Sequence, residues 1–141
     1  MRITESDIKQ KVVSELKKTG FDVLATEIEE GFKKPAVFVN VYQSEIELHS
    51  RDVEDVSDTI EIKYYPSKET TEKCAEAAEK IRQTFMYKPL DVKDRHLNIQ
   101  SMEIDIENCV LYVYFEAEYT QMTPDTDNEY EIAEELELGG I

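Results

Sequence analysis

Two segments of the chain repeat apolar residues at helical spacing. The first begins after Thr4, which can cap a helix together with Asp7 three positions later, and it stops at Gly20. The second lies between residues 70–71, where a threonine can cap it, and Pro89. The apolar positions are Ile8, Val12, Val13 and Leu16 in the first segment, and Cys74, Ala78, Ile81 and Phe85 in the second. We therefore predict two amphipathic helices that each bury one face.

Most of the remaining chain alternates apolar and polar residues, as strands do. The run 36–49 starts with β-branched and aromatic residues and continues with Ile46 and Leu48 between charged neighbours, which is typical of a strand with one wet face. A charged stretch, 51–58, follows, and 59–65 alternates again. These runs predict a long antiparallel hairpin whose tip projects beyond the core.

Shorter strands are predicted around this hairpin. They comprise 21–28, a tight hairpin at 90–97 and a strand from Met102 to Ile106 that turns at Glu107-Asn108. The last strand has the clearest pattern, with five residues facing inward: Leu111, Val113, Phe115, Ala117 and Tyr119. The fold class is therefore α+β, an antiparallel-dominated mixed β-sheet with two main helices packed on it and a long projecting β-hairpin.

The composition changes near the end of the chain. From Pro124 onward there are seven acidic residues and no basic ones, so the segment repels itself. The apolar residues among them, which suit the face of a short helix, are Tyr130, Ile132, Ala133, Leu136 and Leu138. We predict one domain over residues 1–121 and an acidic C-terminal tail over residues 122–141 that is flexible or ordered only on a partner.

The formal net charge of −16 argues against binding to nucleic acid, which needs clustered Lys and Arg. An acidic surface instead repels DNA and selects basic patches on partner proteins. No apolar run approaches the ~20 residues that cross a membrane. The residues after Met1 do not form a signal peptide, and two cysteines are too few for a disulfide framework. We expect a protein that is made and used inside a cell.

A search for catalytic arrangements yields no enzyme hypothesis. His49 and His96 lie near charged residues and have no Cys or Ser at the spacing of a catalytic or metal motif. Carboxylate pairs such as Glu45 with Glu47 arise by chance in so acidic a chain, and the four glycines form no phosphate-binding loop. We therefore predict no catalytic residue, no cofactor and no metal.

Several stretches resemble a family of phage tail terminators, the tail-completion proteins of tailed phages and PBSX-like defective prophages. They are the opening helix from Ile3, the segment 29–39, the segment 60–66 that leads into the second helix, 94–97, and the closing strand 110–119. The resemblance covers roughly residues 1–121. None of these stretches is a chemical motif, so the resemblance carries no catalytic residue.

The resemblance implies an assembly role. Such subunits form a ring, usually of six, that caps a finished tail tube and joins it to the head-side connector; in contractile tails the sheath also meets it. We therefore expect a structural virion protein at the neck end of the tail, present in the host cytoplasm during assembly, whose partners are copies of itself, the tail tube protein, the connector subunit and the sheath.

The hairpin is the predicted contact site, because the region 43–58 is too long and polar to be explained by core packing. The residues that we assign to contacts with other subunits or the tube are Glu45, Glu47, His49, Arg51, Asp52 and Glu54. One alternative is another neck or head-completion subunit. Another, from a different class, is a small cytoplasmic ligand-binding or hydrolytic domain that uses the sheet face and His96.

Overall fold

The computed structural model describes residues 2–24 and 31–124. The predicted acidic tail from residue 125 and the second half of the predicted strand 21–28 lie outside the described residues. Helix α1, Glu5–Lys18, begins as its sequence predicts. The hydroxyl of Thr4 accepts a hydrogen bond from the backbone N–H of Asp7, and the Asp7 carboxylate accepts one from the backbone N–H of Thr4. This capping box satisfies two of the backbone donors that a helix leaves unpaired at its start.

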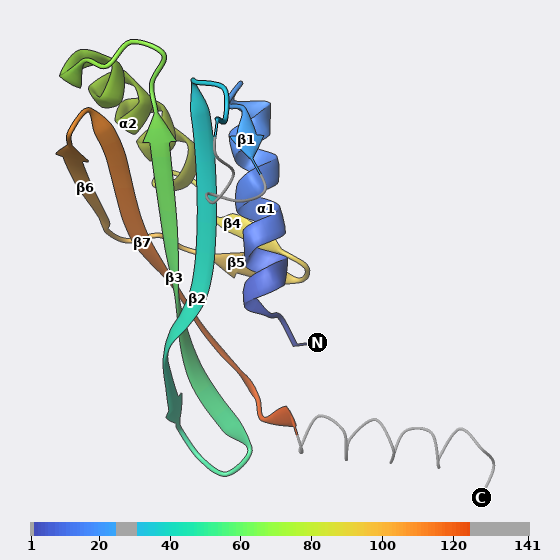
Figure 1. The fold of residues 1–141 in the computed structure, drawn as a ribbon. Coiled ribbons are helices and arrows are strands. Elements are labelled where there is room, and N and C mark those ends of the chain that lie inside the picture. The colour runs from blue at the N-terminus through green and yellow to red at the C-terminus, as the bar shows by residue number, and fades with distance from the viewer. Residues whose placement is uncertain (1, 25–30, 125–141) are drawn as a thin grey trace, which may run out of the picture.

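The chain forms a five-stranded sheet and a separate two-stranded hairpin (Figure 1). The five strands lie in the order β1-β2-β3-β7-β6, and all neighbours are antiparallel except β1 and β2. The bounds are β1 Val23–Leu24, β2 Ala36–Leu48, β3 Val53–Tyr65, β4 Leu90–Val92, β5 Arg95–Leu97, β6 Met102–Glu107 and β7 Val110–Met122. The predicted α+β class with a mixed, mainly antiparallel sheet is confirmed.

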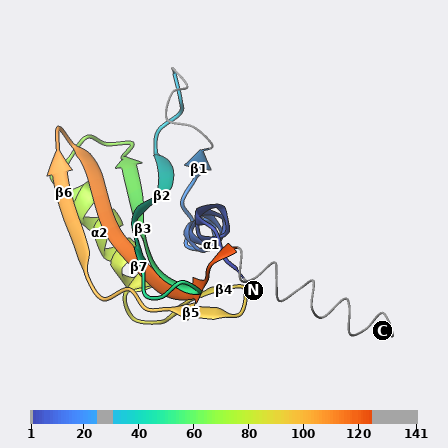
Figure 2. The same ribbon diagram turned by 90° about the horizontal axis from the view of Figure 1, so that it is seen from below.

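Both helices pack on the same face of the large sheet, and within the described ranges no helix covers the other face. Helix α2, Thr71–Phe85, is capped by Thr70 and lies against β7, β6 and β3, whereas α1 lies against β2 (Figure 2). The buried faces of the helices meet the inward residues of β3 and β7 in one core, where Phe85 and Phe115 stack with ring centroids 5.2 Å apart. The inward positions predicted for the last strand, 111–119, are all buried.

Strand β3 starts earlier than the sequence indicates. Residues 53–58, predicted as part of a charged loop, continue the strand: 53–58 pair with β7, and 54–58 also pair with β2. The sequence prediction was wrong here because Glu54 and Asp58 occupy inward positions that strand patterning reserves for apolar residues. A bulge between Gln43 and Glu45 in β2 also shifts the alternation by one residue, so that Ile46 faces the same side as Val56.

The turn between β6 and β7 lies one residue later than predicted. Asn108 and Cys109 both have positive φ, at 51° and 60°, which matches the two-residue turn whose twist suits a hairpin. The tight hairpin between β4 and β5 is confirmed, and Lys93 at its turn also has a positive φ.

We expect Phe115→Ala to lower the free energy of unfolding by about 3–5 kcal/mol, because the substitution leaves a cavity against Phe85. Urea titration followed by circular dichroism measures the loss. Tyr114→Ala is the matched control, since Tyr114 lies on the same strand but on the uncovered face and is half-buried. Equal losses in the two variants would contradict the assignment of the two faces.

Candidate protein-interaction site

The far end of the sheet is a three-stranded extension that we call the distal ribbon. It consists of residues 43–48 of β2, 53–58 of β3 and 117–122 of β7, which pair side by side in that order. Figure 1 shows the β2–β3 hairpin reaching past the ends of both helices, with β7 running along it. The predicted contact residues all lie in this ribbon or in the turn at its tip, residues 49–52.

Two of the predicted contact residues lie on the uncovered face of the ribbon. Glu45 and Glu47 are exposed and pair in register with Ser57 and Asp55. They line a shallow hollow of about 370 Å³, together with residues of β3 and β7 that include Glu118. Four carboxylates therefore surround one concave surface, which gives this face of the ribbon a negative potential that favours basic side chains.

His49 belongs to the same acidic surface. Its Nδ1 lies 3.1 Å from the carboxylate of Asp55, and the hydroxyl of Thr120 donates to that carboxylate at 2.5 Å. The Thr120 hydrogen bond, followed by the His49 interaction, lowers the pKa of Asp55. Asp55 is thus an ionised acceptor held by Thr120 and His49.

The turn at the tip holds Arg51 and Asp52, both exposed. Their backbone carbonyls accept hydrogen bonds from Thr123, whose N–H reaches Asp52 at 2.9 Å and whose hydroxyl reaches Arg51 at 3.3 Å. The end of β7 therefore holds the hairpin turn in place. The side chains of the two residues stay on the surface, at the most distant point from the helices.

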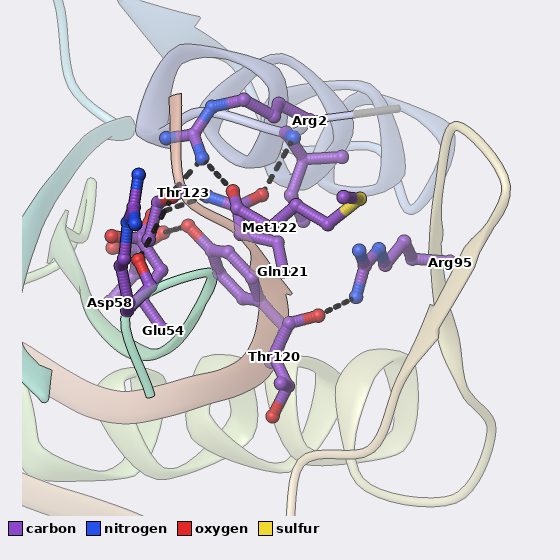
Figure 3. A network of polar contacts seen from close by, with 11 residues as sticks. Arg2, Glu54, Asp58, Arg95, Thr120, Gln121, Met122 and Thr123 are labelled. Carbon is purple, nitrogen blue, oxygen red and sulfur yellow. Dashed lines mark hydrogen bonds and ion pairs between the residues drawn. The ribbon is translucent and has the colours of Figure 1, made fainter. Parts of the chain in front are cut away.

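Glu54 is placed differently from the other predicted contact residues. Its carboxylate accepts from Arg2 at 3.1 Å and from the amide of Gln121 at 3.3 Å, and its residue surface is 9% exposed (Figure 3). The Gln121 side-chain oxygen in turn accepts from the backbone N–H of Ile3 at 3.1 Å. Glu54 thus fastens the N-terminal segment to the inner face of the ribbon.

A second buried carboxylate, that of Asp58, lies four residues after Glu54 on β3. Asp58 is fully buried, and one of its oxygens accepts a hydrogen bond from the Tyr119 hydroxyl at 2.8 Å. Its other oxygen has no hydrogen-bond partner among the described residues. Burial raises the pKa of Asp58, and Glu5 adds to this effect, whereas the Tyr119 bond opposes it. Burial and the Asp58 carboxylate also raise the pKa of Tyr119.

Three exposed apolar residues on β2 were not assigned to the site by sequence reasoning. Tyr42, Ile46 and Leu48 are 45%, 53% and 68% exposed. Alternation had suggested that Ile46 and Leu48 face a core, and they do share a face with Val56, but the described residues place no helix over this part of β2. The signal that could have identified them is the length of the strand, which outruns the helices that cover the sheet.

The two edges of the ribbon, along β2 and along β7, differ in how many of their backbone N–H and C=O groups have hydrogen-bond partners. On the β2 side, β1 pairs with Val37 and Phe38, and within the described residues no strand continues along 39–48. On the β7 side, β6 stops opposite Phe115. There, however, Arg95 donates to the carbonyl of Thr120, and Arg2 donates to that of Met122 (Figure 3). The β2 edge is therefore the more open of the two.

The residues considered for chemistry are not brought together. His96 is exposed and pairs with Asp91 across the β4–β5 hairpin. In the part of the chain that the structure describes, no group of three or more His, Cys, Asp or Glu side chains is arranged to hold a metal ion. No helix within the described ranges is long and apolar enough to cross a membrane. Both cysteines are free, and burial raises the pKa of Cys74.

The fold is an α+β sheet with one open strand edge and an acidic face at its far end. A sequence model of the family described as "Phage tail terminator protein" matches residues 7–129, and the chain belongs to that family. A search of curated proteins finds no match. Membership makes the chain a structural component of a phage tail and confirms the family resemblance of its sequence.

We expect Tyr119→Phe to lower the free energy of unfolding by about 1–3 kcal/mol at pH 7, because it removes the hydrogen bond that the buried Asp58 accepts. The loss shrinks at pH 3.5, which lies below the raised folded-state pKa of Asp58, because the carboxyl group is then mostly neutral. Tyr112→Phe, on the uncovered face of the same strand, is the control and should change little. Chemical unfolding at both pH values measures the difference, and a loss that does not depend on pH would contradict the role given to Asp58.

We expect Asp58→Asn to remove one component of the pH dependence of stability. Because the folded-state pKa of Asp58 is raised above 3.8, the folded protein keeps the carboxyl proton of Asp58 at pH values at which the unfolded chain has lost it. The contribution of this proton to the free energy of unfolding is therefore fully present below pH 3.8 and is lost as the pH rises through the folded-state pKa. The free energy of unfolding of the variant minus that of the parent should rise from pH 3.5 to pH 7. A flat difference would show that Asp58 ionises normally.

Proposed function

We propose that this protein is the subunit of a ring, most simply a hexamer, that caps the tail tube of a phage and joins it to the head-side connector. The observation that carries the proposal is the open edge of β2 with its exposed apolar side chains. A tail structural role follows from the family; the ring, its size and its partners are our proposal. The tail tube protein, the connector subunit and, in a contractile tail, the sheath are its neighbours in the virion.

The β2 edge is suited to join one subunit to the next. An unpaired strand edge offers a row of backbone donors and acceptors to any strand that approaches it. The exposed side chains of Tyr42, Ile46 and Leu48 add apolar surface beside that row. On the β7 edge of the ribbon, Arg95 and Arg2 already donate to backbone carbonyls, so this edge is less open to a further strand. The two edges of the ribbon therefore differ. Such asymmetry suits a head-to-tail contact, which forms a ring when the rotation from one subunit to the next closes.

The acidic face and the tip of the ribbon serve a different contact. Glu45, Glu47 and His49 lie on the uncovered face, and Arg51 and Asp52 lie at the tip. We assign these five residues to contacts with the tube or with a neighbouring subunit that presents basic side chains. Glu54, the sixth residue of the predicted set, is held inside its own subunit by Arg2 and Gln121, and we assign it to fixing the ribbon.

The net charge of −16 sets a condition on assembly. Copies of one acidic subunit repel one another at low ionic strength, and salt screens this repulsion over a Debye length of about 10 Å at 0.1 M. Ring formation should therefore strengthen with salt until apolar and backbone contacts dominate. Where acidic surface faces a central channel, the same charge repels DNA and lets it pass without adhering.

We expect the double substitution Ile46→Lys and Leu48→Lys to abolish ring formation and tube capping while leaving the subunit folded. Both side chains are more than half exposed, and lysine on an edge strand disfavours pairing with another strand. Sedimentation velocity measures assembly, and electron microscopy of tail tubes grown with the protein measures capping as tube length.

Tyr87→Lys with Asn98→Lys is the matched control, because it adds the same charge at exposed positions away from the ribbon. The control should assemble like the parent. Assembly of the Ile46/Leu48 variant at the parent's concentration would overturn the proposed use of the β2 edge. A parent protein that stays monomeric both alone and with tail tubes would overturn the ring itself.

A further inference from the structure

The outer face of α1 carries a basic groove in an otherwise acidic protein. A shallow hollow of about 640 Å³ runs along the helix. Its described lining contains three lysines and no carboxylate, although the chain has 32 acidic residues against 16 basic ones. The lining residues are Ser6, Lys9, Gln10, Val13, Ser14, Lys17 and Lys18. Positive charge is thus concentrated on one helix face.

The lysines of this groove are not neutralised by the fold. Lys18 lies 3.4 Å from Glu15, which also binds Lys11 and Lys88. Lys9 and Lys17 have no ion pair among the described residues. Val13, half-buried between them along the helix, supplies an apolar centre. A ligand that suits this groove combines several negative charges with apolar side chains.

The C-terminal segment, residues 125–141, has this composition. It holds seven carboxylates and no basic residue, and its apolar residues recur at helical spacing. It also starts in a suitable place. Arg2, three residues before α1, donates to the carbonyl of Met122, so the described chain ends beside the first turn of the helix (Figure 2).

We propose that residues 125–141 dock into the α1 groove of their own subunit. The groove extends about 18 Å from Ser6 to Lys18, and the segment spans at least about 25 Å even if it is fully helical. With its origin fixed at the N-terminal end of α1, the segment meets the groove at an effective concentration in the millimolar range. The apolar residues, Tyr130 and Ile132 among them, cover Val13 while the carboxylates pair with Lys9 and Lys17.

The other exposed apolar surface fits this segment poorly. The β2 edge carries Ile46 and Leu48, but Glu45 and Glu47 alternate with them and would repel an acidic segment. The docked segment therefore covers the basic face of α1 and leaves the β2 edge free. A partner with a more basic surface competes for the segment, which makes docking reversible on assembly.

Paramagnetic relaxation in the full-length protein tests the proposal. A nitroxide is attached to Ile132→Cys in a Cys109→Ser background, since Cys74 is buried. We expect the amide signals of Ser6, Gln10 and Ser14 to lose most of their intensity at low salt and to recover it at 1 M NaCl, where the Debye length is about 3 Å.

Charge reversal provides the matched comparison. Lys9→Glu with Lys17→Glu should abolish the signal loss, whereas Lys33→Glu with Lys68→Glu, two exposed lysines off the helix, should preserve it. A mixture of isotope-labelled protein without nitroxide and unlabelled protein with nitroxide distinguishes docking within one subunit from docking between subunits. Amide signals that keep their intensity in the mixture support docking within one subunit. Loss in the mixture, loss centred on Ile46 and Leu48, or no loss on α1 at low salt would each overturn the proposal.

Discussion

The pairing of β3 with β7 over nearly their whole lengths is the contact on which the rest of the molecule depends. It runs from Val53 opposite Met122 to Tyr64 opposite Leu111, and it places β3 between two long strands. An isolated two-stranded hairpin is marginally stable in water, whereas a third strand with one buried face gives it independent support. Because β7 accompanies the hairpin to its turn, the distal ribbon is part of the folded sheet. A surface held in this way keeps its geometry without a partner.

The inner face of the ribbon shows how that extension is stabilised beyond the apolar core. Apolar packing gives way there to a polar network in which Arg2 and Gln121 satisfy Glu54, and Tyr119 satisfies one oxygen of Asp58. Such a network fixes geometry because its donors and acceptors must match, and a buried polar group without a partner is costly. At the centre of the network, one oxygen of Asp58 has no hydrogen-bond partner among the described residues, which makes its burial costly. The raised pKa of Asp58 and the lowered pKa of Asp55 both link the stability of the ribbon to pH.

Charge and strand edges divide the surface into parts with different chemistry. One ribbon edge is closed by guanidinium groups, the other is open, the uncovered face is acidic, and one helix carries a basic groove. In the ring that we propose, the subunit has to meet copies of itself and unlike proteins without aggregating. Repulsion between acidic surfaces disfavours non-specific contact, and the limited open edge restricts where strands can add. In that proposed ring, specific assembly depends on a small part of the surface.

The sequence by itself determined the elements whose signals are local. Thr4 and Asp7 specified the start of α1, and the alternation from Leu111 to Tyr119 specified the buried face of β7, because capping and patterning act between near neighbours. It also located the interacting region in the hairpin, which stays a prediction. Only the tertiary structure decided that 53–58 is strand, that Glu54 is internal, and that Ile46 and Leu48 are exposed. These outcomes depend on residues far away in the chain: Arg2 and β7 make it possible to bury charged residues, and the helices end before they cover the apolar ones.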